Sequence, residues 1–278
     1  GKIRSCFSMT EPNHAGSNPV FMSTTAIKKN DSYIINGRKW YTSSAEGSSF
    51  AIVMAISNPN EKNKYLTASQ IIVPTNSKGF KLIRKIPVMG EEGEGYFSHS
   101  EINYNDVLVP KENLLGKEGS GFKIAQSRLG PGRIHHCMRW IGICERSFDM
   151  MCKRAASREL SPGKFLGEKQ LIHKMIAERR VEINAAKLLV MDVGRKIEKE
   201  GSKESRFDIS MIKFYCANIL KRVIDDAIQI HGGLGMSDDI ILSHFYRHER
   251  AARIYDGADE VHITNVAKGI LSKYGLKI

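Results

Sequence analysis

The sequence predicts an α+β protein in which an antiparallel β domain precedes a helical domain like a four-helix bundle. Residues 1–115 contain short apolar runs that end at turn residues, as strands do. From residue 116 onward, apolar residues recur every three or four positions, which is typical of amphipathic helices. With 278 residues the chain is long enough for two domains, which we expect at 1–115 and 116–278.

The first domain is expected to be a compact sheet with tight turns. In SYIINGRKWYTSS, β-branched and aromatic residues surround Asn36-Gly37, a pair that predicts a hairpin turn between two strands. FAIVMAIS and SQIIVPT have the pattern of buried strands. KNDSYI and the glycine-rich GEEGEGY predict further turns.

The second domain is expected to contain long helices. The segment GFKIAQSRLGPGRIHHCMRWIGICERSFDMMCKRAA is helical on both sides of Gly130-Pro131-Gly132, where the sequence predicts a break. Residues 164–199 and 206–230 continue with helical spacing, and the second segment ends on the glycines of AIQIHGGLGM. Its predicted apolar stripe consists of Ile209, Ile212, Cys216, Ile219, Val223 and Ile230.

Near the end of the chain a carboxylate precedes a helix. A segment at 238–254 leads to Asp256, and Ala258 to Ile270 are good helix formers that stop near Gly275. Asp256 is therefore expected at or next to the N-cap, where its side chain would accept from amides of the first turn.

The composition indicates a globular protein. Hydrophobic residues make up 41% and charged residues 26%, and no apolar run approaches the roughly 20 residues of a membrane span. The net charge is +12, but acids and bases are interspersed, which does not favour nucleic acid as a partner. Five cysteines without a CxxC pair indicate free thiols in a reducing compartment, such as the mitochondrial matrix, the peroxisome or a bacterial cytoplasm.

Three loops carry groups suited to a flat cofactor with a phosphate. SMTEPNHAGSN offers amides and the hydroxyls of Thr10 and Ser17, and KWYTSS sets two aromatic rings beside two hydroxyls. QIHGGLG offers bare backbone amides next to Gln229. Each motif can also be explained without a cofactor, the first as a surface loop, the second as a strand end and the third as a helix C-cap. For each motif alone, the cofactor-binding and the purely structural interpretation both stay open.

Other catalytic patterns are weak or missing. His244 and His248 in HFYRHE raise the alternative of a metal site, but there is no HExxH order and no clear third ligand, so no metal is predicted. Neither a GxSxG nor a P-loop pattern occurs, which argues against common hydrolases and nucleoside triphosphatases.

Five segments, taken in order, resemble motifs of the acyl-CoA dehydrogenase family. MTEPNHAGSN is similar to its flavin loop, INGRKWYTSS to its NG-x-K-x-W-I-T strand, and VPKENLLG to the segment leading into its helices. AIQIHGGLGM is similar to Q-x-x-G-G-x-G, and IYDGADEVH to IYEGTSEIQ. The resemblance runs from Phe7 to about Lys273, and SRLGPGRIHHCMR resembles the branch whose dehydrogenase domain often follows a kinase-like domain. It implies the family's fold, without the N-terminal helical domain that precedes these motifs in other members.

The resemblance implies FAD as the cofactor. Thr10 and Ser43 would hydrogen-bond the isoalloxazine, and Tyr41 takes the place of the family's tryptophan beside the ring. The glycines after Gln229 would meet the pyrophosphate or adenine side across a subunit interface, whereas Arg158 matches its motif only out of register. The cofactor-binding residues carried over by position are Phe7, Met9, Thr10, Ser17, Tyr41, Thr42, Ser43, Arg158, Gln229, Gly232, Gly233, Ala258 and Glu260.

The resemblance also implies a catalytic base. Asp256 matches the family's glutamate, which removes the α-proton of an acyl-CoA while hydride leaves the β-carbon for flavin N5. Some members place the base one residue before the arginine that matches Arg133, but Gly132 occupies that position here. Because aspartate is shorter than glutamate, the substrate and even simple desaturation stay open. The implied substrate-binding residues are Ser17, Arg133, Tyr255, Asp256 and Gly257.

The implied function is α,β-dehydrogenation of an acyl-CoA thioester in fatty acid β-oxidation. Electron-transferring flavoprotein is the implied reoxidant, a homodimer or homotetramer the implied assembly, and hydroxylated or phosphorylated acyl-CoAs the substrates that the branch suggests. Three alternatives stay open. They are a flavin oxidase like nitroalkane oxidase, which also uses an aspartate, a DNA-associated flavoprotein of the same fold, and a catalytically silent scaffold.

Overall fold

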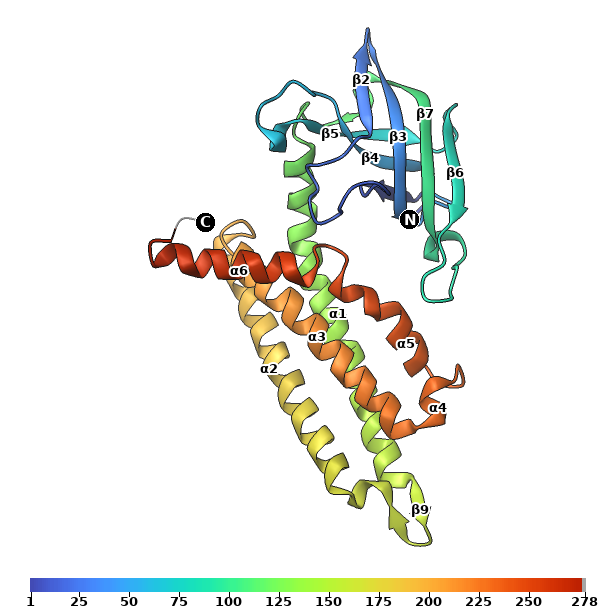
Figure 1. Cartoon of the computed structure of the whole chain (residues 1–278), viewed down its shortest axis with the longest axis vertical. Helices are drawn as coiled ribbons and strands as arrows, with labels where there is room; N and C mark the ends of the chain where they lie inside the picture. The colour runs from blue at the N-terminus through green and yellow to red at the C-terminus, as the bar shows by residue number, and fades with distance from the viewer. Residues whose placement is uncertain (277–278) are drawn as a thin grey trace. The chain divides into compact units, whose positions relative to one another are not determined.

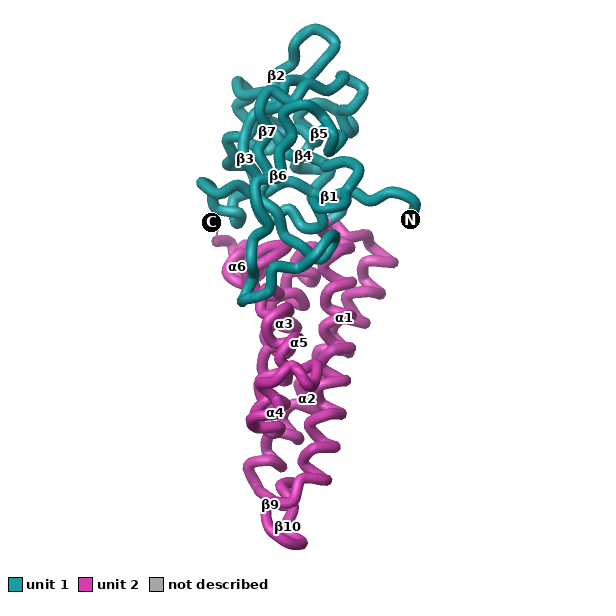
Figure 2. The backbone as a smooth tube through the Cα atoms, turned by 90° about the vertical axis from the view of Figure 1, so that its right-hand side faces the viewer, with its two compact units in different colours: residues 1–128 teal, residues 129–278 magenta. Residues whose placement is uncertain are grey.

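A computed structural model describes residues 1–276, so the last two residues of the predicted second domain lie outside the described residues. The chain divides into two compact units, Gly1–Arg128 and Leu129–Ile278, shown in teal and magenta in Figure 2. The predicted domain boundary at residue 116 stays a prediction.

The first unit is built on a mixed sheet, whose strands are labelled in Figure 1. In the described chain its strands are β1 (Ser5–Ser8), β2 (Thr25–Lys29), β3 (Ser32–Ser43), β4 (Phe50–Ile56), β5 (Ala68–Pro74), β6 (Phe80–Lys85), β7 (His99–Pro110) and β8 (Leu114–Leu115). The order is β6-β7-β3-β2-β4-β5-β8, with β1 beside β4. Most pairs are antiparallel, as predicted, whereas β4 pairs in parallel with both β1 and β2.

The sheet core follows from alternation along the strands. Tyr33 and Ile35 of β3 are buried two positions apart, and Val107 and Val109 repeat this spacing on β7. The β3–β7 register pairs Tyr33 with Val109 and Ile35 with Val107, so these side chains share one face. The fold class predicted for this part is confirmed.

The predicted hairpin at Asn36-Gly37 is wrong. Both residues lie inside β3, where the register with β7 shifts and forms a β-bulge. Asn36 Nδ2 donates to Asp106 Oδ1 on β7 at 2.9 Å, so pairing with a distant strand replaces the local turn. The hairpin lies earlier, between β2 and β3, where Asn30 has φ 53°.

The second unit consists mainly of long helices that run side by side, as Figure 1 shows. The described helices of the chain are α1 (Gly121–Ser157), α2 (Gln170–Glu200), α3 (Arg206–His231), α4 (Gly233–Met236), α5 (Leu242–Glu249) and α6 (Asp259–Lys273). The short hairpin β9 (Glu159–Ser161) and β10 (Lys164–Phe165) joins α1 to α2. The 3-10 turns are η1 (Lys64–Leu66), η2 (Gly95–Phe97), η3 (Lys111–Asn113), η4 (Leu166–Glu168) and η5 (Arg250–Arg253). Among residues 1–276, no helix combines the length and apolarity that a bilayer crossing requires.

The predicted stripe on α3 is confirmed, because all six of its residues are buried. The predicted break at Pro131 is wrong, since α1 continues through it. A proline removes one helical hydrogen bond and costs roughly 3 kcal/mol. Beyond it, Cys137, Trp140 and Cys144 are buried in the same core as α3, and this packing maintains the helix.

Gly37 supplies a test of the bulge. A Cβ built there would lie 2.4 Å from Thr24 Oγ1 and 2.6 Å from Thr24 Cα. Gly37→Ala is therefore expected to destabilise the protein by about 1–3 kcal/mol through overpacking. Urea unfolding followed by circular dichroism measures this loss.

Gly142→Ala is the control, because apart from the neighbouring backbone of α1 no heavy atom would lie within 4 Å of its Cβ, and the residue is exposed. It should leave stability unchanged or raise it by up to about 1 kcal/mol. Equal stability of Gly37→Ala and wild type would contradict the close approach of β3 to Thr24.

Candidate functional site

The turn before α6 holds a strained backbone. Asp256 has φ 52° and Gly257 φ 102°. A non-glycine residue in the left-handed region costs on the order of 1–3 kcal/mol and persists only where its surroundings fix it. At Gly257 a Cβ would lie 2.7 Å from His262 Nε2, so only glycine fits. The groups around this turn therefore determine its geometry.

Three side chains from three helices hold the two carbonyls of the turn. Arg133 Nε on α1 donates to the Asp256 carbonyl at 2.9 Å, and His262 Nε2 on α6 lies 3.2 Å from the same oxygen. Lys213 Nζ on α3 donates to the Gly257 carbonyl at 2.5 Å. Both carbonyls are thus bound from the helical core.

Two of the three holding groups, Lys213 and His262, are fully buried, and burial shifts their pKa values. Desolvation lowers the pKa of Lys213 to about 8, against the opposing charges of Asp259 and Asp256. Desolvation, with the charges of Arg133 and Lys213, lowers the pKa of His262 to about 4. His262 is therefore neutral near pH 7, and its Nε2–H donates to the turn while Nδ1 lies 3.2 Å from Ser210 Oγ.

The carboxylate of Asp256 faces α1 instead of the start of α6. Its Oδ2 lies 3.0 Å from His136 Nε2, and the side chain is 20% exposed. The N-cap of α6 is Ala258, which makes no side-chain cap bond. The expectation that Asp256 lies at or next to the N-cap is therefore wrong, because the positive φ of the turn directs its side chain elsewhere.

Tyr255 is anchored as a neutral phenol. Its OH accepts from Arg139 Nη2 at 3.0 Å, and Arg139 also pairs with the buried carboxylate of Glu249. Trp140 Nε1 donates to Glu249 Oε2 at 3.0 Å. Burial, followed by the charge of Glu249, raises the pKa of Tyr255 to about 12. The residue before the candidate base therefore keeps its proton at neutral pH.

A second organised loop, in the first unit, follows β1. Lys39 is fully buried and its Nζ donates to Glu11 Oε1 and to the Met9 carbonyl, both at 2.8 Å. Glu11 also accepts the backbone N–H groups of Ser23 at 2.7 Å and Thr24 at 2.9 Å. A buried ion pair with its hydrogen bonds satisfied therefore ties both ends of the loop together.

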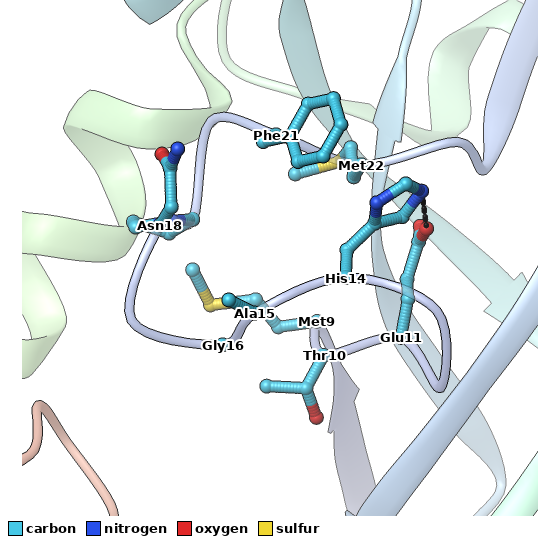
Figure 3. A pocket seen from close by; sticks show the side chains of 10 residues that line it. Met9, Thr10, Glu11, His14, Ala15, Gly16, Asn18, Phe21 and Met22 are labelled. Atoms are coloured by element: carbon cyan, nitrogen blue, oxygen red, sulfur yellow. Dashed lines mark ion pairs between the residues drawn. The ribbon is translucent and has the colours of Figure 1, made fainter.

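The same loop contains a small hollow between Met9 and Met22 (Figure 3). His14 Nε2 lies 3.6 Å from Glu11 Oε2, the contact drawn as a dashed line in Figure 3, and the His14 ring meets Phe21 edge-on with ring centroids 4.4 Å apart. Burial opposes ionisation of Glu11, but Lys39 and the donors from Thr24 and Ser23 lower its pKa to about 2. Glu11 is thus ionised at any physiological pH.

The end of β3 presents groups that fit a flat aromatic cofactor. Tyr41 and Ser44 have φ 48° and 66°, and these left-handed residues flank Thr42 and Ser43. Hydrogen bonds hold this end, with Thr10 Oγ1 donating to the Trp40 carbonyl at 2.9 Å. Tyr41 is 48% exposed, and the exposed Ser43 hydroxyl lies 2.7 Å from His99 Nδ1. An exposed ring beside an exposed hydroxyl on a fixed backbone suits an isoalloxazine ring, so these residues fit FAD.

The structure brings some predicted site residues together and leaves others apart. Arg133, Tyr255, Asp256 and Gly257 lie in one cluster of the second unit, with Ala258 adjoining them. In the first unit, Thr10 contacts β3, Thr42 Oγ1 lies 3.2 Å from Ser8 Oγ, and Arg128 stacks over Phe7. Other predicted residues take no part in these contacts. Ser17 is exposed in its loop, and Glu260 lies in the first turn of α6. The others are Arg158, Gln229, Gly232 and Gly233.

Within the second unit, Arg158 lies between α1 and β9 in the chain. Figure 1 shows β9 at the opposite end of the long helices from α6. Gln229 lies in the last turn of α3, and Gly232, with φ 64°, is the C-cap of that helix, so the predicted glycine stop is confirmed. The cofactor roles of these residues stay predictions.

Sequence reasoning missed His136, Lys213 and His262. Lys213 did carry a signal, because a lysine within the apolar stripe of α3 must be buried. His136 lies three residues after Arg133 and four before Trp140, which places all three on one face of α1. His262 gave no local signal, since one partner, Ser210, is distant in the sequence and the other is a backbone carbonyl, which no residue type identifies.

Known proteins match this chain over nearly its whole length. The sequence model of "Acyl-CoA dehydrogenase, middle domain" matches residues 6–107, and that of "Acyl-CoA dehydrogenase, C-terminal domain" matches residues 119–271. "Probable acyl-CoA dehydrogenase FadE2" of Mycobacterium tuberculosis is 44% identical over 98% of the chain and 67% of that protein.

"Acyl-CoA dehydrogenase family member 11" of Gallus gallus is 42% identical over 96% of the chain, which spans only 35% of that protein. A solved structure from Mycobacterium abscessus, assigned to the acyl-CoA dehydrogenases, superposes with a TM-score of 0.93 at 37% identity. That superposition covers 98% of this chain and 67% of the other.

The Glu11–Lys39 pair predicts a specific pH dependence. Because the pKa of Glu11 is lowered from 4.5 to about 2, its contribution is fully present above pH 4.5 and is lost as pH falls toward 2. At about 1.4 kcal/mol per pKa unit, this contribution is roughly 3 kcal/mol. Glu11→Gln should therefore unfold more easily than wild type at pH 7, with a difference that closes between pH 4.5 and 2.

Urea midpoints measured across this pH range test the prediction. Glu112→Gln, at an exposed glutamate of the same unit, is the control and should follow wild type. A constant difference between Glu11→Gln and wild type from pH 7 to 2 would show that the carboxylate charge does not stabilise the loop.

Lys213→Met tests whether Lys213 stabilises the turn that contains Asp256 and Gly257. The methionine cannot donate a hydrogen bond, so the Gly257 carbonyl loses its bond from Lys213 Nζ. A hydrogen bond from a charged group contributes about 1.5–3 kcal/mol. Backbone amides at residues 255–258 should therefore exchange about 10- to 100-fold faster, as hydrogen-exchange mass spectrometry can measure. Lys221→Met, at an exposed position on the same helix, is the control. Equal exchange in both variants would refute the role of Lys213.

Proposed function

This chain belongs to the acyl-CoA dehydrogenase family, and we propose that it carries out FAD-dependent α,β-dehydrogenation of an acyl-CoA thioester with Asp256 as the base. The observation that supports this most strongly is the strained turn at Asp256, whose backbone is fixed by three side-chain donors from α1, α3 and α6. Backbone strain that the surrounding structure maintains is characteristic of functional sites.

In the proposed reaction the α-carbon loses a proton and the β-carbon loses a hydride. The carboxylate of Asp256 accepts the α-proton, and the electron pair of that C–H bond becomes the new C=C bond. When bound, FAD supplies the acceptor for the hydride. Arg133, whose Nε binds the carbonyl of Asp256, acts by fixing the turn, and its charge favours the ionised base.

The surroundings of Asp256 suit a base that must act at neutral pH. Its side chain is 20% exposed, so it is partly removed from water yet reachable. Tyr255 precedes it as a neutral phenol and adds no negative charge that would repel the developing enolate. We propose the backbone N–H of Asp256 as a donor to the thioester oxygen, where the enolate charge develops.

The cofactor residues are proposed from two local arrangements. Thr10, Tyr41 and Ser43 are proposed to hold the isoalloxazine, supported by the exposed ring and hydroxyl at the end of β3. Gln229 and the glycines that follow it are proposed for the pyrophosphate or adenine, supported by the exposure of Gln229 in the last turn of α3 and of Gly232 and Gly233 directly after that helix.

The substrate class and the partners are also proposals. Hydroxylated or phosphorylated acyl-CoAs are proposed as substrates, electron-transferring flavoprotein as reoxidant, and a homodimer or homotetramer as the assembly. The similarity to family member 11, whose length this chain covers in part, supports the choice of branch. Oxygen consumption in the absence of electron-transferring flavoprotein would instead identify an oxidase.

Asp256→Asn tests the base. The amide keeps the shape of the carboxylate but does not accept a proton, so dehydrogenation should fall by about 100-fold or more. The measurement is anaerobic bleaching of the FAD-bound protein by a panel of acyl-CoAs, with FAD content determined in parallel. FAD content should not change.

The control is Asp149→Asn, at an exposed aspartate of α1 that pairs with Lys153, and this variant should bleach at the wild-type rate. Bleaching of Asp256→Asn at the wild-type rate would exclude Asp256 as the base. A wild-type protein that binds FAD and is bleached by no acyl-CoA would refute the proposed function itself.

A further inference from the structure

His136 contacts the side chain of the candidate base, whereas Arg133 and His262 contact its backbone carbonyl. Its Nε2 lies 3.0 Å from Asp256 Oδ2, which is hydrogen-bond distance. The contact joins α1 to a turn that lies more than a hundred residues later, so neither local sequence nor helix capping accounts for it.

Two aromatic rings fix the orientation of the imidazole. His136 stacks on Trp140 with ring centroids 5.8 Å apart and an interplanar angle of 19°. The ring of Tyr255 lies 5.0 Å from that of His136 at 56°. Both aromatic residues are anchored in turn, because Trp140 Nε1 donates to Glu249 and the Tyr255 hydroxyl accepts from Arg139. The imidazole is therefore held by residues that themselves have fixed positions.

The hydrogen-bonding chemistry of His136 and Asp256 determines which ring nitrogen of His136 carries a hydrogen. An ionised carboxylate only accepts hydrogen bonds, so the ring nitrogen that faces it must carry a hydrogen. Nε2–H of His136 is thus the donor and Asp256 Oδ2 the acceptor. A carboxylate has about four lone-pair sites, and this bond occupies one of them.

The side chains are also accessible to different degrees. His136 is 33% exposed and Asp256 20%. A pair that served only to stabilise the core would be expected to be more deeply buried, like Glu249 with Trp140 at 6% and 0%. A partly open pair at a strained turn matches a site where a carboxylate must stay reachable and keep one orientation.

We propose that His136 is the positioning residue of the base: its Nε2–H holds the short carboxylate of Asp256 in the rotamer that meets the substrate. This inference rests on the proposed function. Arg133, His262 and Lys213 fix the backbone of the turn, and His136 fixes the side chain that extends from it. An aspartate has less reach than a glutamate, and a misplacement of about 1 Å can cost on the order of 100-fold in rate.

The first test measures the hydrogen bond without any substrate. In protein labelled with ¹⁵N-histidine, a hydrogen-bonded Nε2–H of His136 should exchange slowly enough with water to give an N–H cross-peak. The loss of that peak in His136→Gln assigns it. Asp256→Ala should remove or strongly weaken the peak, because the acceptor is gone. A peak of the same intensity in Asp256→Ala would overturn the pairing, whatever the activity of the protein.

The second test separates positioning from a structural role. His136→Leu should lower kcat by about 10- to 100-fold on the acyl-CoA that reacts fastest with wild type, with KM and FAD content nearly unchanged. His136→Gln, which keeps an N–H donor of similar reach, should recover most of that loss. His135→Leu, at the exposed neighbouring histidine, is the control and should match wild type.

The outcomes distinguish this inference from the proposed function. Wild-type kcat in His136→Leu, or an equal loss in His136→Leu and His136→Gln together with a lowered melting temperature, would overturn the positioning role. A wild-type protein that shows the histidine cross-peak but reacts with no acyl-CoA would overturn the proposed function and support the pairing.

Discussion

The turn before α6 depends on side-chain donors that bind its carbonyls, two of which, Lys213 and His262, are fully buried. Lys213, Arg133 and His262 reach Asp256 and Gly257 from three different helices. Removing these polar groups from water is costly, and the cost is offset only because each has a fixed partner. In a medium of low dielectric these hydrogen bonds are strong, so they can hold a backbone conformation that the residues would not adopt alone. The helical bundle is thus the scaffold for a single strained turn.

The first unit applies the same physics to a different loop. Lys39 is fully buried, and its contact with Glu11 is surrounded by backbone donors and acceptors. Such pairs add little net stability compared with well-packed apolar residues, but breaking one is strongly destabilising. Their effect is therefore to restrict the loop to one arrangement, and Thr10 in that loop is hydrogen-bonded to the end of β3. Both candidate binding regions are in this way fixed by buried charges.

The local signals that misled the sequence analysis have a common cause. Asn36-Gly37 favours a turn and Pro131 favours a helix end, yet both lie inside long elements. In each case the packing of many residues outweighs the preference of two or three. The cap expected at Asp256 failed for a related reason, because the backbone of the turn is set by side chains from elsewhere. Periodic patterns over many residues, such as the stripe on α3, were predicted correctly.

The sequence by itself determined the α+β class, the family and the identity of the acid before the last helix, because these depend on periodicity and on ordered motifs along the chain. Only the tertiary structure decided what surrounds that acid. His136 and Lys213 meet the turn through contacts between helices, and no spacing in the sequence encodes such a contact. Local preferences act over a few residues, whereas the position of a functional carboxylate is decided by groups that folding brings together from distant segments.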